Sequence, residues 1–162
     1  MSPAPGHEEP FAQRMMGLHD DLAQRFFAHQ SSLLDRDFVR AASHLAGYRE
    51  RLLRHMQDEE SLVLPRYRQA GGDETDAPVR LFLGEHQKMR EFVADCEQRV
   101  QRLVERPDDR LLLELFDREA TYKNLVMHHD LRERNALYPF VACKVAATEL
   151  QQILEQLRWS GS

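Results

Sequence analysis

Residues 38–62 read FVRAASHLAGYRERLLRHMQDEESL, and apolar side chains recur in this stretch every three or four positions. This period is typical of an amphipathic α-helix with one side turned toward a core. The inward stripe consists of Phe38, Ala41, Leu45, Tyr48, Leu52, His55, Glu59 and Leu62. His55 and Glu59 stand out, because a stripe that packs against other helices is normally apolar throughout.

Three other segments carry stripes of the same period. The first stripe contains Phe11, Met15, His19, Leu22, Phe26, His29 and Leu33. The third contains Val79, Phe82, His86, Met89, Val93, Cys96, Val100 and Leu103. The fourth contains Leu112, Leu115, Glu119, Tyr122, Val126, His129, Glu133, Ala136 and Phe140. The sequence has no alternating Val/Ile/Thr run and no Asn-Gly hairpin dipeptide, so an all-α fold is predicted.

Turn-forming residues separate the four segments. They are Asp35–Asp37, Gly71–Gly72 with Pro78, Pro107–Asp108 and Pro139. We expect long helices near residues 11–34, 38–70, 78–106 and 109–138. Four such helices joined by short turns predict an up-down-up-down four-helix bundle.

The segment after Pro139 predicts an additional C-terminal helix near residues 141–158. Its apolar residues are Val141, Val145, Leu150, Ile153, Leu154, Leu157 and Trp159. This helix either caps the end of the bundle or forms a homodimer interface, and the sequence leaves both alternatives open. We expect residues 1–162 to form a single domain, with the bundle spanning about 11–140.

The composition narrows the classes of partner. The chain has 162 residues, a net charge of −5, 42% hydrophobic and 30% charged residues, and no block of Lys and Arg. Nucleic acid and anionic membrane are therefore poor partners. No apolar run approaches the roughly 20 residues of a membrane span, and residues 1–10 lack the pattern of a secretion signal. The two cysteines form no Cys-x-x-Cys pair, which predicts a cytoplasmic location.

Six polar residues interrupt the stripes, and they are predicted to meet. They are His19, His55, Glu59, His86, His129 and Glu133. Residues equidistant from an antiparallel turn lie at the same level, so His55 faces the position of His19 and His86 faces His129. At about 1.5 Å per residue the two levels differ by about 5 Å. Each glutamate follows a histidine by four positions and lies on the same helix face.

Four imidazoles and two carboxylates in one layer have the composition of a dinuclear metal site. Fe, Mn and Zn accept both ligand types, and paired carboxylates can bridge two ions. Two buried carboxylates without cations would cost several kcal/mol each or become protonated. The alternative for these residues is a buried His–Glu hydrogen-bond network without metal.

Four motifs resemble the hemerythrin-like, or HHE cation-binding, family. They are Leu-His-Asp-Asp-Leu at 18–22, His-Met-Gln-Asp-Glu-Glu at 55–60, Gly-Glu-His-Gln-Lys-Met at 84–89 and His-His-Asp-Leu-Arg-Glu at 128–133. The resemblance covers about residues 11–140 and implies a non-haem di-iron centre in a four-helix bundle. It implies that His19 and His55 ligate one iron and that His86 and His129 ligate the other. Glu59 and Glu133 would bridge the two ions.

The sequence departs from the oxygen-carrying hemerythrins at two positions. Their fifth histidine corresponds to Arg90, and their last-helix carboxylate is an Asp five residues after its His, whereas Glu133 follows His129 by four. An alternative register pairs His128 with Glu133, although His128 lies off the stripe. Without the fifth His, water, Glu60, Glu85 or an exogenous ligand could take the open positions.

The resemblance therefore leaves three functions to compare. The first is a di-iron protein that binds or senses O2, NO or redox state. The second is a di-iron peroxidase, oxidase or iron-handling protein. The third is a metal-free helical interaction module.

Other polar residues have less to do with the predicted site. His29 and His44 mirror each other across the first turn and are expected to form a hydrogen-bonded pair at the bundle edge, while Glu119 is expected near solvent. Tyr48 and Tyr122 precede His55 and His129 by seven positions and are either packing residues or an electron relay. Cys96 and Cys143 are expected to be small buried residues.

Overall fold

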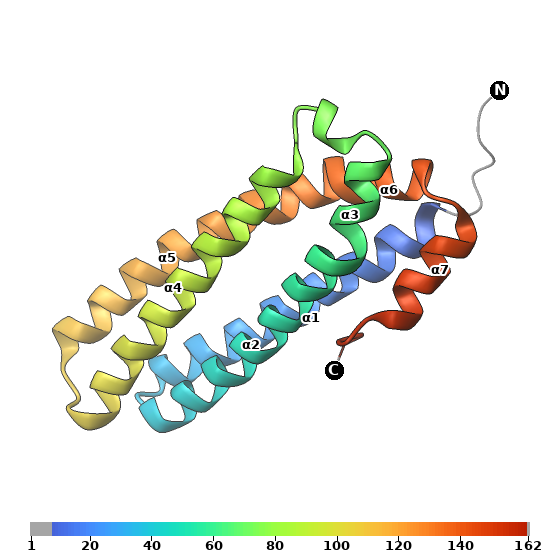
Figure 1. The fold of residues 1–162 in the computed structure, drawn as a ribbon. Coiled ribbons are helices and arrows are strands. Elements are labelled where there is room, and N and C mark those ends of the chain that lie inside the picture. The colour runs from blue at the N-terminus through green and yellow to red at the C-terminus, as the bar shows by residue number, and fades with distance from the viewer. Residues whose placement is uncertain (1–7, 162) are drawn as a thin grey trace.

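Long antiparallel helices make up most of the computed structural model, which describes residues 8–161 (Figure 1). They are α1 (Glu8–Leu34), α2 (Phe38–Asp58), α4 (Val79–Glu105) and α5 (Asp109–Arg132). Within residues 8–161 no strand is formed, which confirms the all-α prediction. Residues 1–7, on which the expectation of no secretion signal largely rests, lie outside the described part.

Aspartate side chains begin two of the long helices. The carboxylate of Asp37 accepts the backbone N–H of Arg40 at 3.0 Å at the start of α2. At the start of α5, Asp108 accepts the N–H groups of Arg110 and Leu111 at 2.8 and 3.2 Å. Each cap satisfies backbone donors that have no partner within the helix. The predicted turns at Asp35–Asp37 and Pro107–Asp108 therefore stop one helix and start the next.

Two π-helical turns continue the second and fourth helices, and each begins at a glutamate of the predicted site. The turn η1 (Glu59–Val63) leads into α3 (Leu64–Gln69), and η3 (Glu133–Leu137) leads into α6 (Tyr138–Lys144). Pro65 and Pro139 lie just beyond the turns. A proline has no N–H and its ring clashes with the carbonyl four residues back, so the helix widens before it.

The π turns change which residues face the core. After Glu59 the buried residues are Val63, Leu64 and Tyr67, whereas the predicted Leu62 is only partly buried. After Glu133 the buried residues include Leu137, Tyr138 and Val141, while Ala136 and Phe140 are partly buried. The prediction that Pro139 ends the fourth helix was wrong, because the widened turn accommodates the proline and the helix runs on to Lys144.

The additional helix is shorter than expected. It is α7 (Ala147–Gln156), and it lies at the end of the bundle that also holds α3 and α6 (Figure 1). Its Leu150 and Ile153 are buried within the chain, as is Trp159 in the segment that follows. In this structure α7 therefore caps the bundle.

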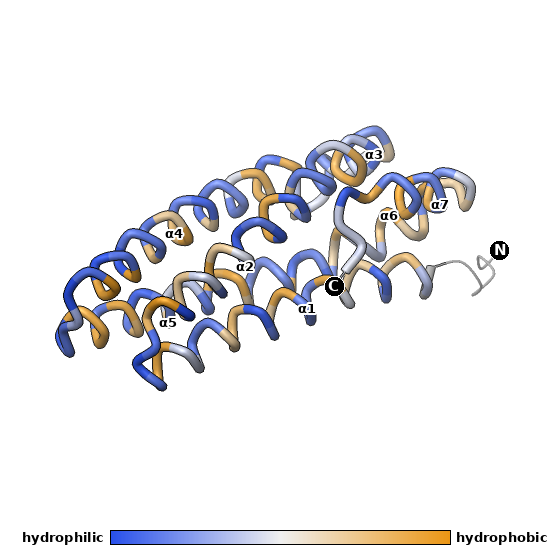
Figure 2. The backbone as a smooth tube through the Cα atoms, turned by 90° about the horizontal axis from the view of Figure 1, so that it is seen from below, coloured by the Kyte–Doolittle hydropathy of each residue, from blue (hydrophilic) through white to orange (hydrophobic). Residues whose placement is uncertain are grey.

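The core follows the predicted stripes along the four long helices. Figure 2 shows hydrophobic and hydrophilic positions alternating turn by turn along each of them. Met15, Phe26, Phe82 and Met89 belong to this core, as expected. Among the described residues, no helix is long and apolar enough to cross a membrane.

Candidate metal centre

The six predicted polar residues meet in the middle of the bundle. His19, His55, Glu59 and Glu133 bring one ligand atom each to within 4.8 Å of one another. Glu59, His86, His129 and Glu133 form a second group by the same measure. All six side chains are buried. The two groups share the two glutamates, which is the arrangement expected of carboxylates that bridge two ions.

The imidazoles pair across the helix hairpins. The ring centroids of His19 and His55 are 5.1 Å apart, and those of His86 and His129 are 4.9 Å apart. The first pair joins α1 to α2, and the second joins α4 to α5. Both pairs match the levels expected from equal distances to the turns.

All four imidazoles turn Nε2 toward the shared carboxylates. The distance from Nε2 of His19 to Oε2 of Glu133 is 2.9 Å, and from Nε2 of His129 to Oε1 of Glu133 it is 2.8 Å. The Nε2 atoms of His55 and His86 lie 3.5 and 3.3 Å from Glu59 oxygens. One nitrogen of each ring is thus directed at the space between the glutamates.

A second carboxylate faces the other nitrogen of three rings. Nδ1 of His86 lies 2.9 Å from Glu60, and Nδ1 of His129 lies 2.7 Å from Glu85. Nδ1 of His19 lies 3.2 Å from Asp130. At His86 and His129 the carboxylate accepts the Nδ1–H hydrogen bond, which keeps the proton on that nitrogen and leaves Nε2 as the basic atom, whereas Nδ1 of His19 has only the ion-pair contact. The rings are thereby prepared to donate Nε2 lone pairs to a cation.

Arginines fix two of these outer carboxylates. Arg90 donates to Glu60 at 2.7 Å, and Arg132 donates to Glu85 at 2.8 Å. Each arginine, glutamate and histidine forms a chain that ends at Nε2 inside the cluster. Glu60 and Glu85, which the sequence left as possible ligands of the open positions, instead orient the imidazoles.

The carboxylates also control the charge of the imidazoles. Burial lowers the pKa of His86, but Glu133, Glu59 and Glu60 outweigh it and raise that pKa to about 11. Burial also lowers the pKa of His129, while Glu133 and Glu85 raise it to about 9. The pKa of His55 is lowered, chiefly by burial. Without a cation, protonated imidazoles must therefore balance the buried carboxylates.

Several polar atoms of the cluster are buried and lack a hydrogen-bond partner among the described residues. They are Nδ1 of His19, both ring nitrogens of His55, Nε2 of His86, Oε2 of Glu59 and Oε1 of Glu133; some of them lie within ion-pair distance of one another but not in hydrogen-bond geometry. Such atoms are rare in protein interiors, because each costs about 1–3 kcal/mol when left unpaired. Nε2 of His55, Nε2 of His86 and the two carboxylate oxygens lie around the space between the glutamates, and cations placed there would satisfy these four atoms. The donor set therefore fits metal ions that accept both imidazole and carboxylate ligands.

The comparison with known families points to the same chemistry. The model of the hemerythrin HHE cation-binding domain matches residues 11–141. The chain belongs to this family. No curated protein and no solved structure gave a significant match. Both the family and the buried His/Glu groups of this hemerythrin-like chain point to metal binding.

Tyr138 enters the centre of this hemerythrin-like bundle, although the sequence analysis did not single it out. Its hydroxyl donates to Oε1 of Glu59, lies 3.0 Å from Oε2 of Glu133 and contacts Nε2 of His19 at 2.9 Å. The phenol is completely buried, and burial together with the two carboxylates raises its pKa well above the usual value. The regular period points to Phe140 as the inward residue, and only the π turn brings Tyr138 inward.

Two residues expected at the edge of the bundle are fully buried. Nε2 of His29 lies 2.5 Å from Glu119, and its Nδ1 bonds the backbone oxygen of Ala41 at 2.8 Å. The predicted His29–His44 pair was therefore wrong, and so was the placement of Glu119 near solvent. Two residues 90 positions apart in the sequence satisfy each other here, separately from the metal-binding cluster.

The remaining predictions have mixed outcomes. His128 is exposed and lies outside the cluster, so the structure does not bring it to Glu133. The hydroxyls of Tyr48 and Tyr122 are 2.6 Å apart in the core. Cys96 is buried as expected, but Cys143 is exposed.

Proposed function

We propose that this hemerythrin-like protein holds two iron ions and binds or senses a small diatomic ligand, O2 or NO, or redox state. The observation that carries the proposal is the sharing of Glu59 and Glu133 by two buried ligand groups. We assign His19 and His55 to one ion and His86 and His129 to the other. The two glutamates would bridge them.

Iron is proposed because the chain belongs to the hemerythrin family, although Mn and Zn accept the same ligands. When bound, a pair of iron ions would supply reversible electron transfer and a coordination position for an exogenous ligand. The carboxylates would supply negative charge to such ions, and the neutral imidazoles would supply nitrogen lone pairs. Two negative charges from Glu59 and Glu133 would partly neutralise two divalent cations.

The surrounding residues support the site in three ways. The arginine–glutamate–histidine chains hold the imidazoles of His86 and His129 with Nε2 inward. All six side chains of the cluster are buried within the apolar core, which would limit the contact of bound ions with bulk water. The C-terminal segment covers one end, where the indole of Trp159 lies edge-on to the ring of His55 at 6.1 Å.

A second candidate function is a di-iron peroxidase or oxidase, and Tyr138 is the observation that favours it. Reduction of peroxide requires protons as well as electrons. The raised pKa keeps the Tyr138 hydroxyl protonated, and this donor contacts both bridging glutamates. Multiple turnover of peroxide by the purified protein would favour the enzyme, whereas stable reversible ligand binding would favour the carrier or sensor.

Metal analysis of natively purified protein tests the proposal. We expect about two iron ions per chain and a visible absorption spectrum that changes when reduced protein is exposed to air. Protein that contains no stoichiometric metal, and takes up none from ferrous salt without oxygen, would contradict it. Stoichiometric zinc or manganese would keep the site but reject the proposed iron chemistry.

A further inference from the structure

A cavity of about 480 Å³ lies between α1 and α5, with α2 forming its floor. Its volume falls in the range of about 300–1,000 Å³ that is typical of sites for small organic molecules. A diatomic ligand needs far less space. The cavity reaches the imidazoles of His19, His55 and His129 at one end.

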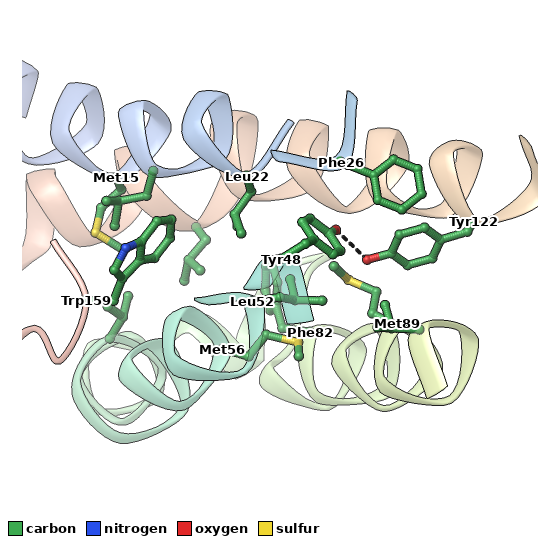
Figure 3. Packing of buried hydrophobic residues seen from close by; sticks show 14 of the residues in the cluster. Met15, Leu22, Phe26, Tyr48, Leu52, Met56, Phe82, Met89, Tyr122 and Trp159 are labelled. Carbon is green, nitrogen blue, oxygen red and sulfur yellow. Dashed lines mark hydrogen bonds between the residues drawn. The ribbon is translucent and has the colours of Figure 1, made fainter. Parts of the chain in front are cut away.

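Apolar and aromatic side chains form the walls. Seven of them are labelled in Figure 3, where they extend from different helices toward a common space: Leu22, Phe26, Tyr48, Leu52, Met56, Met89 and Tyr122. At the mouth, the side chains of Phe27, Met127 and Leu131 are 71%, 51% and 41% exposed. Small residues on the facing helices, Ala23 and Val126, leave room between α1 and α5.

The wall also presents a hydrogen-bond donor without an acceptor. Tyr48 and Tyr122 line the cavity and are almost completely buried. Their hydroxyls share one hydrogen bond, drawn in Figure 3, and make no other among the described residues. Burial raises the pKa of both phenols, so both keep their protons. Two protons and one shared hydrogen bond leave one O–H free to donate.

We propose that this cavity is a binding site for an uncharged aromatic molecule that carries one hydrogen-bond acceptor, such as a carbonyl oxygen. The aromatic and sulfur-containing walls match a flat apolar ring. The free tyrosine O–H matches the acceptor and gives the bound molecule its orientation.

The charges at the mouth favour an uncharged ligand. The ammonium group of Lys123 donates a hydrogen bond to the side chain of Gln30 at 3.3 Å. Asp130 lies 3.2 Å from His19, and Arg134 adds a positive charge nearby. The rim therefore carries both signs, and burying a charged group among the apolar walls would be costly.

This inference goes beyond metal binding and does not depend on it. The walls and the free O–H belong to the protein whether or not ions occupy the neighbouring cluster. With ions bound, the organic molecule would lie beside three of their proposed ligands. A failure of the metal proposal would leave the cavity and its donor unchanged.

Fluorescence titration with Prodan tests the proposal, because Prodan is an uncharged naphthyl ketone whose emission reports the polarity around it. We expect saturable, blue-shifted emission with one Prodan per chain. 2-Acetylnaphthalene and 2-ethylnaphthalene are then used to displace Prodan. The two molecules have similar shapes, but only the first has a hydrogen-bond acceptor. The titration is run on purified protein before and after chelator treatment, so loss of metal and loss of Prodan binding are distinguished.

Two sets of variants locate the binding site. Val126→Trp fills the cavity and should weaken Prodan binding at least 10-fold, whereas Leu113→Trp, at an exposed position of α5 away from the cavity, should leave it unchanged. Ala23→Phe is a second filling variant from α1. The wild-type protein should bind 2-acetylnaphthalene more tightly than 2-ethylnaphthalene. The Tyr48→Phe/Tyr122→Phe double variant should reduce the ratio of these two affinities roughly 3- to 10-fold, which is the effect of one hydrogen bond. Each single Tyr→Phe variant retains one hydroxyl and should keep the preference.

Three results would overturn the inference. One is unchanged Prodan affinity in folded Val126→Trp and Ala23→Phe proteins. Another is an unchanged acetyl-to-ethyl ratio in the folded double variant. The third is absence of Prodan binding, and sedimentation as a dimer in that case would assign the apolar mouth to a second copy of the chain.

Discussion

Arg90 occupies the position of the fifth histidine in the oxygen-carrying hemerythrins, and here it binds a carboxylate of the protein. Its guanidinium donates to Glu60, whose carboxylate faces Nδ1 of His86. Arg132 and His129 on α5 repeat this arrangement with Glu85 of α4. Outer partners of this kind typically change metal affinity by 10- to 100-fold when they are removed. Where those hemerythrins have a histidine, this chain therefore has an arginine that helps to orient His86, a proposed ligand.

Replacing a proposed ligand should remove metal and stability together. We expect His55→Ala to lose at least one of two ions per chain and to melt at a lower temperature, because bound metal stabilises only the folded state. Metal analysis and thermal unfolding of the same preparation measure both effects. His128→Ala is the matched control, because His128 is exposed and lies outside the cluster. A His55→Ala protein with full metal content would contradict the ligand assignment.

Removing the Tyr138 hydroxyl should matter more without metal than with it. In metal-free protein, Tyr138→Phe removes the one hydroxyl that contacts both Oε1 of Glu59 and Oε2 of Glu133. We expect a loss of about 1–3 kcal/mol in the free energy of unfolding, measured in urea. Bound cations would take over both carboxylates and reduce this loss.

Tyr67→Phe provides the control for that comparison. The Tyr67 hydroxyl is buried and donates to the backbone oxygen of Ala77 at 2.8 Å, outside the cluster. Its replacement should cost the same with and without metal. Equal metal dependence of the two variants would show that Tyr138 is only a packing residue.

The two π-helical turns, η1 and η3, have the same local structure. Each π turn begins at a glutamate of the buried cluster that follows a cluster histidine by four residues, and each ends shortly before a proline. The backbone N–H of Leu64 bonds the oxygen of Glu59, and that of Tyr138 bonds the oxygen of Glu133, five residues back in both cases. The wider turn rotates the following helix by about one residue. Each helix thus places a glutamate in the cluster, and the residues after the π turn that face the core differ from those of a regular helix.

The C-terminal segment is held to the bundle by Asp58. One carboxylate oxygen of this buried residue accepts the backbone N–H groups of Arg158 and Trp159 at 2.9 and 3.1 Å. We expect Asp58→Ala to release the segment and shift the emission of Trp159, the only tryptophan in the chain, to longer wavelength. Asp58→Asn keeps an acceptor oxygen and should shift the emission less.

The fluorescence comparison is best made in metal-free protein, because Asp58 adjoins Glu59. Asp21→Ala is a control, since the ion pair of Asp21 with Arg25 lies on the part-exposed surface of α1. Unchanged Trp159 emission in folded Asp58→Ala protein would mean that the indole is held by packing alone.

At the scale of the whole molecule, pH should act differently on metal-free and metal-loaded protein. The folded-state pKa of His129 is raised to about 9 and that of His86 to about 11, above the roughly 6.5 of an unfolded chain. Their protonated forms therefore stabilise the fold fully below about pH 6.5, and this contribution is lost as pH rises through the folded-state values. We expect the melting temperature of metal-free protein to fall between pH 7 and pH 10.

Bound metal should remove that pH dependence. Metal-bound imidazoles are neutral, so no proton is lost from them over this range. Each kcal/mol corresponds to roughly 2–4 °C in a chain of this size, which makes thermal unfolding across pH a sufficient measurement. Parallel pH profiles with and without metal would contradict the assignment of His86 and His129 as ligands.

Much of the fold follows from regular features of the sequence. The 3.6-residue period identifies the buried faces of the long helices. Every predicted stripe residue of α1, α2 and α4 is buried, and in α5 all of them are buried except Val126, which is partly buried. Equal distances from the turns predict the pairing of His19 with His55 and of His86 with His129. These predictions succeed because a helix advances by a constant rise and rotation per residue.

Helix packing, and not the sequence pattern, sets the position of Tyr138, the partner of His29 and the path of the C-terminal segment. A π turn breaks the constant rotation, so the period points to Phe140 where the fold buries Tyr138. The contact of His29 with Glu119 and that of Asp58 with Trp159 join residues far apart in the chain. Local periodicity carries no information about such contacts, because they depend on how whole helices pack.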